Sequence, residues 1–214
     1  ADAIVNLPKM KTHGQMLLTL GVKNLFGCVV GRAKAAWHFD VGFDRDRFAS
    51  LLLDIAGAVA PCLTILDGVV GMDGEGPTSG RPNPWGVVAA ARDPLLMDLR
   101  LCRMMGVRLE DFPLYRAARQ RRLPQCALND ADVAGDLPPD HVFSVRLPAQ
   151  GSLRLLPRLP FLERAMTSRP IQIAERCIGC GRCAEVCPAD ALILRGRTLR
   201  FDYGKCIRCY CCHE

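Results

Sequence analysis

Residues 177–188 have the sequence CIGCGRCAEVCP, and the spacing of its cysteines decides what the C-terminal part of the chain is built around. Cys177, Cys180 and Cys183 are separated by two residues each, Cys187 follows after three more, and a proline comes next. Three thiolates at such gaps surround one metal centre, while the fourth, after a short helical turn, points away from it. Eight of the twelve cysteines lie within the last 38 residues, a grouping typical of metal ligands rather than of disulfides.

This pattern, C-x2-C-x2-C-x3-C-P, is that of bacterial ferredoxins and predicts [4Fe-4S] clusters. Zinc is the alternative, but zinc sites usually combine two separated pairs of ligands, which a triplet followed by Cys-Pro does not resemble. The small residues Gly179 and Gly181 allow the backbone to approach a cluster and donate N–H groups to its sulfurs. Thiolate ligation of metal indicates a reducing compartment, so we expect a cytoplasmic protein.

A second cysteine triplet follows a predicted hairpin over residues 191–206. Ligation is crossed in two-cluster ferredoxins, so we expect Cys187 to join the second triplet. That triplet consists of Cys206, Cys209 and Cys212. The first triplet then needs a cysteine two positions beyond Glu214, and we expect the sequence to be cut within this motif. We interpret Cys211 and His213 as flanking residues, with Cys211 as an alternative ligand.

The composition indicates a globular protein with a sizeable core, because half of the 214 residues are hydrophobic. The net charge of +6 is spread along the chain without the basic stripe or motif of a nucleic-acid-binding protein, so we expect no nucleic-acid partner. The longest uncharged apolar run, residues 55–66, is shorter than the roughly 20 residues of a membrane span. The sequence begins without a signal peptide or an initiator methionine, so we also expect residues missing before Ala1.

Strand and helix patterns alternate over residues 1–146, which predicts an α/β layer domain. The expected strands are 3–7, 62–68, 85–93 and 130–136, and the expected helices are 16–27, 44–61, 93–106 and 109–122. Residues 147–170 are a predicted linker rich in Pro and Arg. Residues 171–214 form a small α+β, ferredoxin-like iron–sulfur domain, whose hairpin is expected to turn at Gly196.

Lysine is rare in this chain and concentrated near its start. There are 23 Arg but only five Lys, and four of the five lie within residues 9–34, beside two of the four histidines. Lys is a compact charge with a tunable pKa, so this clustering predicts a site that binds an anion such as phosphate or carboxylate, or that transfers protons. The alternative is a solvated basic loop and helix face. The candidate catalytic residues are Lys9, Lys11, His13, Lys23, Asn24 and His38.

A glycine-rich acidic stretch, LDGVVGMDGEGPTSGRP, covers residues 66–82. Glycines allow a backbone to come close to a ligand, and carboxylates bind hard metals or orient lysines. The candidate cofactor-binding residues are therefore Asp67, Asp73 and Glu75. The stretch is neither a P-loop nor a dinucleotide fingerprint, and a flexible surface loop is the alternative.

These stretches together resemble the family called domain of unknown function 362 (DUF362). The resemblance rests on NLPKMKTH at 6–13, GVKNLFG at 21–27, WH at 37–38, DGVVGMDGEGPTSG at 67–80 and ARDPLLMDLRLCRMMG at 91–106. In that family a ferredoxin-type domain often follows, as it does here, and members are usually longer at both ends. The resemblance implies an uncharacterised iron–sulfur protein and no particular substrate.

The leading hypothesis is an iron–sulfur protein that passes electrons through [4Fe-4S] clusters, two of them in the full-length protein, to or from the Lys/His site. It implies a redox partner protein and a small anionic substrate, and an oxidoreductase if the protein is an enzyme. The alternative is a non-enzymatic electron carrier or subunit whose α/β domain docks a partner. A third reading gives the clusters a structural or redox-sensing role.

Overall fold

The computed structural model describes residues 2–30, 32–41, 44–77, 80–127, 133–136, 142–148, 169–207 and 211–213. The chain divides into two compact units, one formed by residues 1–28 and 43–150 and the other by residues 29–42 and 151–214. Within the described ranges, no helix is both long and apolar enough to cross a membrane.

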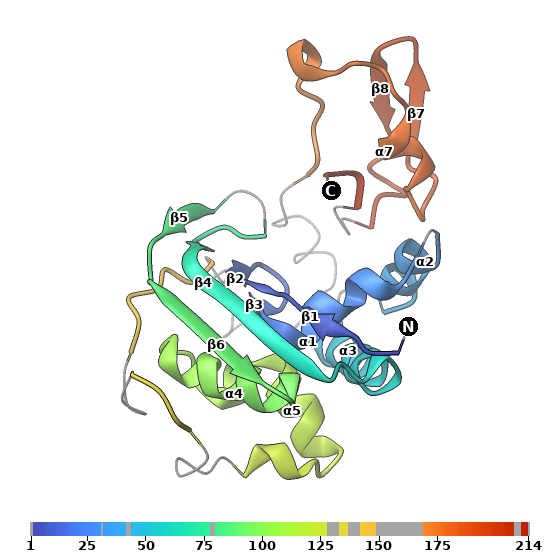
Figure 1. The fold of residues 1–214 in the computed structure, drawn as a ribbon. Coiled ribbons are helices and arrows are strands. Elements are labelled where there is room, and N and C mark those ends of the chain that lie inside the picture. Colours follow the sequence, from blue (N-terminus) through green and yellow to red (C-terminus); the bar gives the residue numbers. More distant parts are fainter. Residues whose placement is uncertain are drawn as a thin grey trace, which may run out of the picture. The chain divides into compact units, whose positions relative to one another are not determined.

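The first unit is built on one mixed sheet with β4 (Leu63–Asp73) at its centre (Figure 1). Its parallel neighbours are β1 (Val5–Asn6) and β2 (Lys9–His13), and its antiparallel neighbours are β5 (Arg81–Asn83) and β6 (Val87–Ala91). The edge strand β3 (Leu17–Thr19) pairs antiparallel with β2. The register aligns Lys9 with Asp67 and Asp67 with Val88, so these three side chains share one face of the sheet.

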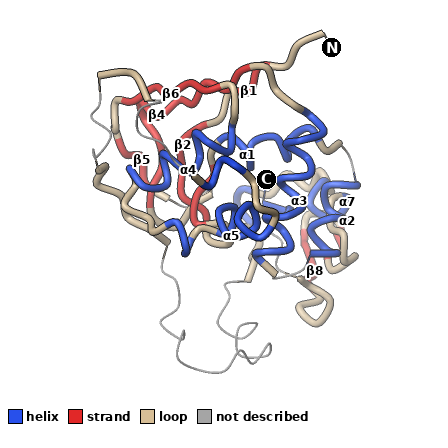
Figure 2. The backbone as a smooth tube through the Cα atoms, turned by 90° about the horizontal axis from the view of Figure 1, so that it is seen from below, coloured by secondary structure: helices blue, strands red, loops and turns tan. Residues whose placement is uncertain are grey.

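Helices cover the other face of this sheet, as Figure 2 shows. They are α1 (Gly21–Asn24), which continues into a 3₁₀ turn at Leu25–Cys28, α3 (Arg45–Val59), α4 (Pro94–Met104) and α5 (Pro113–Gln120). The inward-facing Met10 and Leu66 are fully buried, whereas Val5 and Val88 on the opposite face are 50% and 62% exposed. Alternate residues of β2 therefore belong to two environments, a packed core and an open face.

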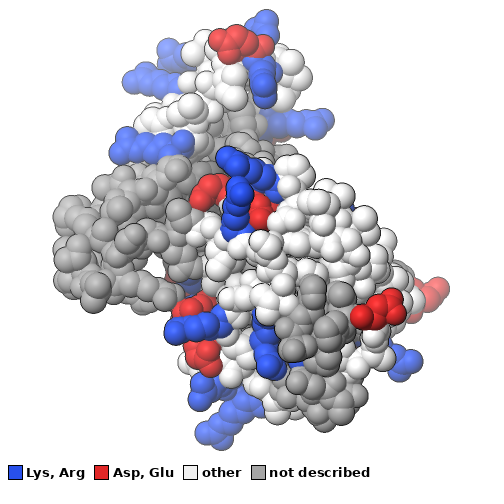
Figure 3. Space-filling view, turned by 90° about the vertical axis from the view of Figure 1, so that its left-hand side faces the viewer, with Lys and Arg blue, Asp and Glu red and all other residues white. Residues whose placement is uncertain are grey.

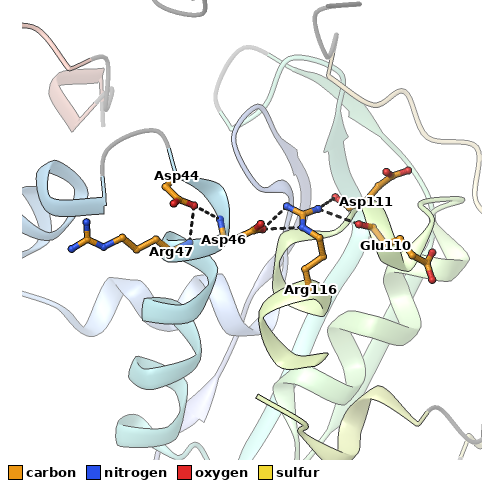
Figure 4. Close-up of polar contacts among 6 residues, drawn as sticks. All are labelled: Asp44, Asp46, Arg47, Glu110, Asp111 and Arg116. Carbon is orange, nitrogen blue, oxygen red and sulfur yellow. Dashed lines mark hydrogen bonds and ion pairs between the residues drawn. The ribbon is translucent and has the colours of Figure 1, made fainter. Parts of the chain in front are cut away.

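Two arginines, Arg116 of α5 and Arg121 directly after it, hold α5 to α3. The Asp44 carboxylate caps α3 by accepting hydrogen bonds from the backbone N–H groups of Asp46 and Arg47. The Asp46 carboxylate in turn accepts from Arg116 Nε at 2.9 Å and Nη2 at 2.5 Å, and Figure 4 shows this guanidinium also reaching the loop before α5. Further toward the C-terminus of α3, both carboxylate oxygens of Asp54 accept hydrogen bonds from Arg121, at 2.6 and 3.0 Å. These contacts lower the pKa of the Asp54 carboxyl.

The sequence predicted the helices over 44–61, 93–106 and 109–122, and the structure confirms them as α3, α4 and the 3₁₀ turn at Leu109–Asp111 followed by α5. The predicted helix over 16–27 is wrong in its first part, because pairing with β2 makes Leu17–Thr19 a strand. The predicted strand over 130–136 is absent from residues 133–136, and residues 130–132 lie outside the described ranges.

The second unit contains α2 (Arg32–Val41), α7 (Arg182–Glu185) and a hairpin of β7 (Leu192–Arg195) with β8 (Thr198–Phe201). The hairpin turns at Gly196, the position that the sequence predicted, and φ there is 60°. Short 3₁₀ turns occur at Ala174–Arg176 and Cys211–His213. A small core lies beneath the hairpin, and cysteines contribute to it.

Candidate functional site

The first cysteine motif is a tight loop shaped by two glycines. Gly179 and Gly181 have φ of 74° and 79°, a conformation that favours glycine, and Gly181 precedes α7 directly. Arg197, in the hairpin turn, donates to the Cys177 carbonyl from Nε at 3.1 Å and from Nη2 at 2.5 Å. This loop is therefore fastened to the hairpin by a cationic side chain.

Cysteines of the two motifs meet in the core of the second unit. Cys187 of the first motif and Cys206 of the second are 7% and 9% exposed, and they lie in one buried cluster with Ala191 and Leu192. Cys212 packs against the same cluster. The Cys187 sulfur also accepts a hydrogen bond from the Ala191 N–H at 3.2 Å, the kind of donor that stabilises a thiolate.

The remaining cysteines of the first motif are more accessible. Cys177 and Cys183 are half-buried and Cys180 is exposed, while Cys209 lies outside the described residues. In the part of the chain that the structure describes, no three His, Cys, Asp or Glu side chains already share a metal-holding geometry. The chemistry of the donors nevertheless fits a [4Fe-4S] cluster, because thiolates, positive-φ glycines and a backbone N–H aimed at sulfur occur together.

In the first unit, the alternation of β2 brings three of the candidate residues to the open face. Lys9 is exposed, Lys11 and His13 are half-buried, and the residues between them point into the core. The Lys9 ammonium lies 2.6 Å from Asp67 Oδ2. This hydrogen bond, together with the Val69 N–H bonded to Asp67 Oδ1, lowers the pKa of Asp67.

His13 is oriented by its own turn. Its Nδ1 atom lies 3.1 Å from the Gln15 backbone nitrogen and 3.2 Å from that of Met16. Both backbone groups are donors, so Nδ1 acts as the acceptor in this turn.

Lys11 is aligned with Thr19 across the β2–β3 pair, so the two side chains share a face. Thr19 is only 7% exposed, and among the described residues its hydroxyl has no hydrogen-bond partner. No ion pair involves Lys11 within the described residues either. A half-buried cation and a buried hydroxyl thus lie side by side without partners in the described part of the chain.

The other three predicted catalytic candidates lie elsewhere. Asn24, on α1, donates to the side chain of Asn6 at 2.8 Å, and Asn6 donates to the Gly21 carbonyl at 2.9 Å. Asn24 thus supports the packing of α1 on β1, and Lys23 is half-buried on the same short helix. His38 belongs to α2, in the second unit.

The predicted acidic residues do not gather into one ligand set. Asp73 is buried, and its Oδ2 accepts from Asn83 Nδ2 at 2.9 Å and from the Arg146 N–H at 3.1 Å, so it holds backbone together. Asp67 is paired with Lys9, as described above, and Glu75 is exposed.

The glycines of this stretch do bring it close to β2. The Gly14 N–H donates to the Gly76 carbonyl at 3.0 Å, and Thr12 Oγ1 donates to the Gly74 carbonyl at 2.8 Å. A Cβ at Gly76 would lie 2.1 Å from the Thr12 carbonyl oxygen. The loop is therefore packed against the end of β2 that carries His13.

The sequence interpretation missed Asp98, which lies on α4 and is fully buried. Its two oxygens accept from the N–H groups of Gly21 at 2.7 Å and Val22 at 2.8 Å, which anchors the start of α1. Burial raises the pKa of Asp98 to about 8, against the opposing effect of these two hydrogen bonds. The available signal was an acidic residue in the otherwise apolar face of the 93–106 helix.

Comparison with known proteins gives two family matches. Residues 1–103 match the family "Domain of unknown function (DUF362)", and residues 170–193 match "4Fe-4S binding domain". The chain is 43% identical over 123 residues to the "Thylakoid-associated protein sll1697" of Synechocystis sp., an alignment that covers 58% of this chain. It covers 38% of that relative, so the chain spans less than half the length of the curated protein it matches. No solved structure matches the chain.

Proposed function

We propose that this protein exchanges electrons between a redox partner and a ligand site on β2. The proposal starts from the match of the chain to DUF362 and to a 4Fe-4S binding domain, which supports an iron–sulfur electron-transfer protein. The cysteine motifs supply the [4Fe-4S] clusters, which accept and release single electrons. The α/β domain supplies the ligand site, formed by Lys9, Lys11 and His13 on the open face of the sheet. In this role the protein acts as a cytoplasmic oxidoreductase.

The observation that carries the proposal is the meeting of Cys187, Cys206 and Cys212 in one core cluster, where the first two are buried and Cys212 is partly buried. It supports crossed ligation, in which Cys187 binds the same cluster as the cysteines of the second motif. The remaining thiolate of that cluster is Cys209. Cys177, Cys180 and Cys183 are then the thiolates that this chain offers to a second cluster. Within this scheme, the residues Arg197, Gly179 and Gly181 shape the loop around that second cluster.

A specific observation also favours the alternative, a carrier that docks a partner. Residues 169–207 contain seven Arg and Lys residues but only four Asp and Glu residues, and all eleven are exposed. Figure 3 shows cationic side chains protruding from this unit. Such a surface suits a redox partner with an acidic docking face, which would associate faster at low ionic strength.

The test is chemical analysis of the protein purified without oxygen, for iron, acid-labile sulfide, other metals and bound small molecules. The proposal expects iron and sulfide in equal amounts, reducible by one electron per cluster. Zinc in place of iron would contradict it. A second measurement, on Lys11→Gln, distinguishes an enzyme from a carrier. If the protein is an enzyme, the substitution abolishes turnover; if it is a carrier, electron exchange with the partner is unchanged.

A further inference from the structure

The loop of the first cysteine motif presents an apolar side chain to solvent directly beside candidate cluster ligands. Ile178 lies between Cys177 and Cys180, and its 79% exposed fraction exceeds that of every other large apolar side chain described in residues 169–207. Cys180 is exposed as well, whereas Cys187 and Cys206 are 7% and 9% exposed in the core beneath the hairpin. A protein that approaches this unit therefore comes closest to the ligands of the first motif.

Three arginines flank this apolar side chain. Arg176 and Arg182 stand at the two ends of the loop, both are exposed, and neither forms an ion pair within the described residues. The third is Arg197 in the hairpin turn, whose guanidinium is held at the loop backbone. The nearest acidic residues in the sequence are Glu175 and Glu185. Both lie outside the two arginines, so the loop between them carries no negative charge.

The hairpin has a second face with similar residues that lies away from this loop. Leu194 is on the face turned toward the loop, because its Cδ2 atom is 3.7 Å from where a Cβ at Gly181 would lie. Side chains alternate between the two faces of a strand, so Ile193 and its cross-strand partner Arg200 lie on the opposite face. These two residues, both exposed, are matched controls for the isoleucine and the arginines of the first motif.

An apolar centre with a charged rim is the usual anatomy of a protein–protein interface. The apolar side chain is removed from water when a partner covers it, and the charged rim selects a partner of opposite sign. Because the rim here is made of arginines without acidic neighbours inside the loop, a cationic partner is repelled and an acidic one is attracted. The attraction also directs the encounter, and it weakens as ionic strength rises.

We propose that Ile178, with Arg176, Arg182 and Arg197 around it, is the docking surface for an acidic one-electron carrier protein. This inference rests on the proposed function and deepens it, because it names the surface and the kind of redox partner. In the complex one electron leaves the reduced protein and enters the oxidised one, and no bond forms or breaks. The partner then faces the ligands of the first motif, and the buried cysteines lie behind them.

Binding of an acidic flavodoxin to the full chain with its clusters tests the inference. Both proteins are kept oxidised, so isothermal titration calorimetry at low ionic strength measures association alone. The expected result is saturable binding that weakens as salt is added. Ile178→Asp should weaken binding about tenfold or more, because it removes the apolar contact and adds a charge that an acidic partner repels. Ile193→Asp, the same substitution on the opposite face of the hairpin, should change the affinity by less than about twofold.

Arg182→Glu and Arg200→Glu form a second matched pair. Arg182→Glu reverses a charge of the rim and should weaken binding about tenfold or more, whereas Arg200→Glu should have a much smaller effect. Equal iron and sulfide contents in the four variants show that the clusters are retained. If Ile178→Asp loses its clusters, Ile178→Ala replaces it, since this variant removes the apolar contact without adding a charge.

Equal losses of affinity within either pair, or no binding by the wild type, overturn the inference. So does binding that does not respond to salt. Association of oxidised proteins requires no electron transfer, so the titration stays readable whatever metal the chain holds. Zinc in place of iron therefore contradicts the proposed function, while a failed binding pattern in a chain with intact [4Fe-4S] clusters contradicts only the inference.

Discussion

Cys187 and Cys206 belong to different cysteine motifs, yet both are buried in the same small core of the second unit. Nineteen positions of sequence separate them, including the whole of the β7–β8 hairpin, which folds the second motif back onto the first. The Ala191 N–H, at the start of that hairpin, donates to the Cys187 sulfur at 3.2 Å. The hairpin thus positions the last cysteine of one motif beside the first cysteine of the next.

Arg197 is expected to raise the reduction potential of the cluster at the first motif. Its guanidinium is held at the Cys177 carbonyl, and a nearby positive charge favours the reduced, more negative cluster. Arg197→Gln should lower that potential in a redox titration followed by EPR. Arg197→Lys, which keeps the charge, should recover most of the difference.

The matched control for this prediction is Arg200→Gln. Arg200 is an exposed arginine on the same hairpin, and within the described residues it makes no hydrogen bond to the cysteine loop. Equal shifts in Arg197→Gln and Arg200→Gln would show that the potential responds to overall charge and not to the position of Arg197.

Asp98→Asn should destabilise the first unit by about 1–3 kcal/mol at pH 5, as measured by urea unfolding. At pH 5 the Asp98 carboxyl is protonated, but each of its oxygens keeps a lone pair for one of the two N–H groups, whereas the asparagine side chain has one oxygen and its NH₂ group faces the remaining N–H. Asp98→Ala should be at least as destabilising. An unchanged free energy of unfolding in Asp98→Asn would contradict the anchoring role.

Asp98 should also make stability depend on pH. The folded pKa of about 8 lies above the value of 3.8 expected for the unfolded chain, so between these values the folded state holds a proton that the unfolded state has released. The contribution of Asp98 to the free energy of unfolding therefore falls as pH rises from about 4 to about 8. The difference between wild type and Asp98→Asn should narrow over this range, and a difference that widens would contradict the raised pKa.

Gly76→Ala should separate the loop of residues 74–77 from β2. The added Cβ would lie 2.1 Å from the Thr12 carbonyl oxygen, which is backbone and unable to move aside without disturbing the strand. We expect a loss of about 1–3 kcal/mol in unfolding free energy, the range for overpacked sites. Gly27→Ala is the control, since a Cβ there meets no atom within 4 Å, and a similar loss in both variants would argue against the specific contact.

Local signals in the sequence were sufficient for much of the fold. Asp44 and Asp93 before their helices, together with the glycine at the hairpin turn, define the ends of α3, α4 and β7–β8 through interactions within a few residues. The comparisons confirm the DUF362 resemblance and the iron–sulfur domain, and the α/β fold class is confirmed as well. The predicted domain boundaries and ligand assignments stay predictions.

The rest depends on contacts between residues far apart in the chain. Leu17–Thr19 reads as part of a helix, but the turn that His13 organises returns it along β2 as a strand. Three of the six candidates for the Lys/His site lie on one face of β2, because alternate residues of a strand share a face. The other three lie on α1 and α2. Asp98 was missed because its role depends on backbone groups more than 70 positions away.

The measurement that tests the central claim most directly compares the EPR spectra of three reduced variants, Cys177→Ala, Cys187→Ala and Cys206→Ala, prepared without oxygen. Crossed ligation predicts that Cys187→Ala loses the same cluster signal as Cys206→Ala and keeps the signal that Cys177→Ala loses. If Cys187→Ala instead reproduces the spectrum of Cys177→Ala, the four cysteines of the first motif bind one cluster together, and the account is contradicted.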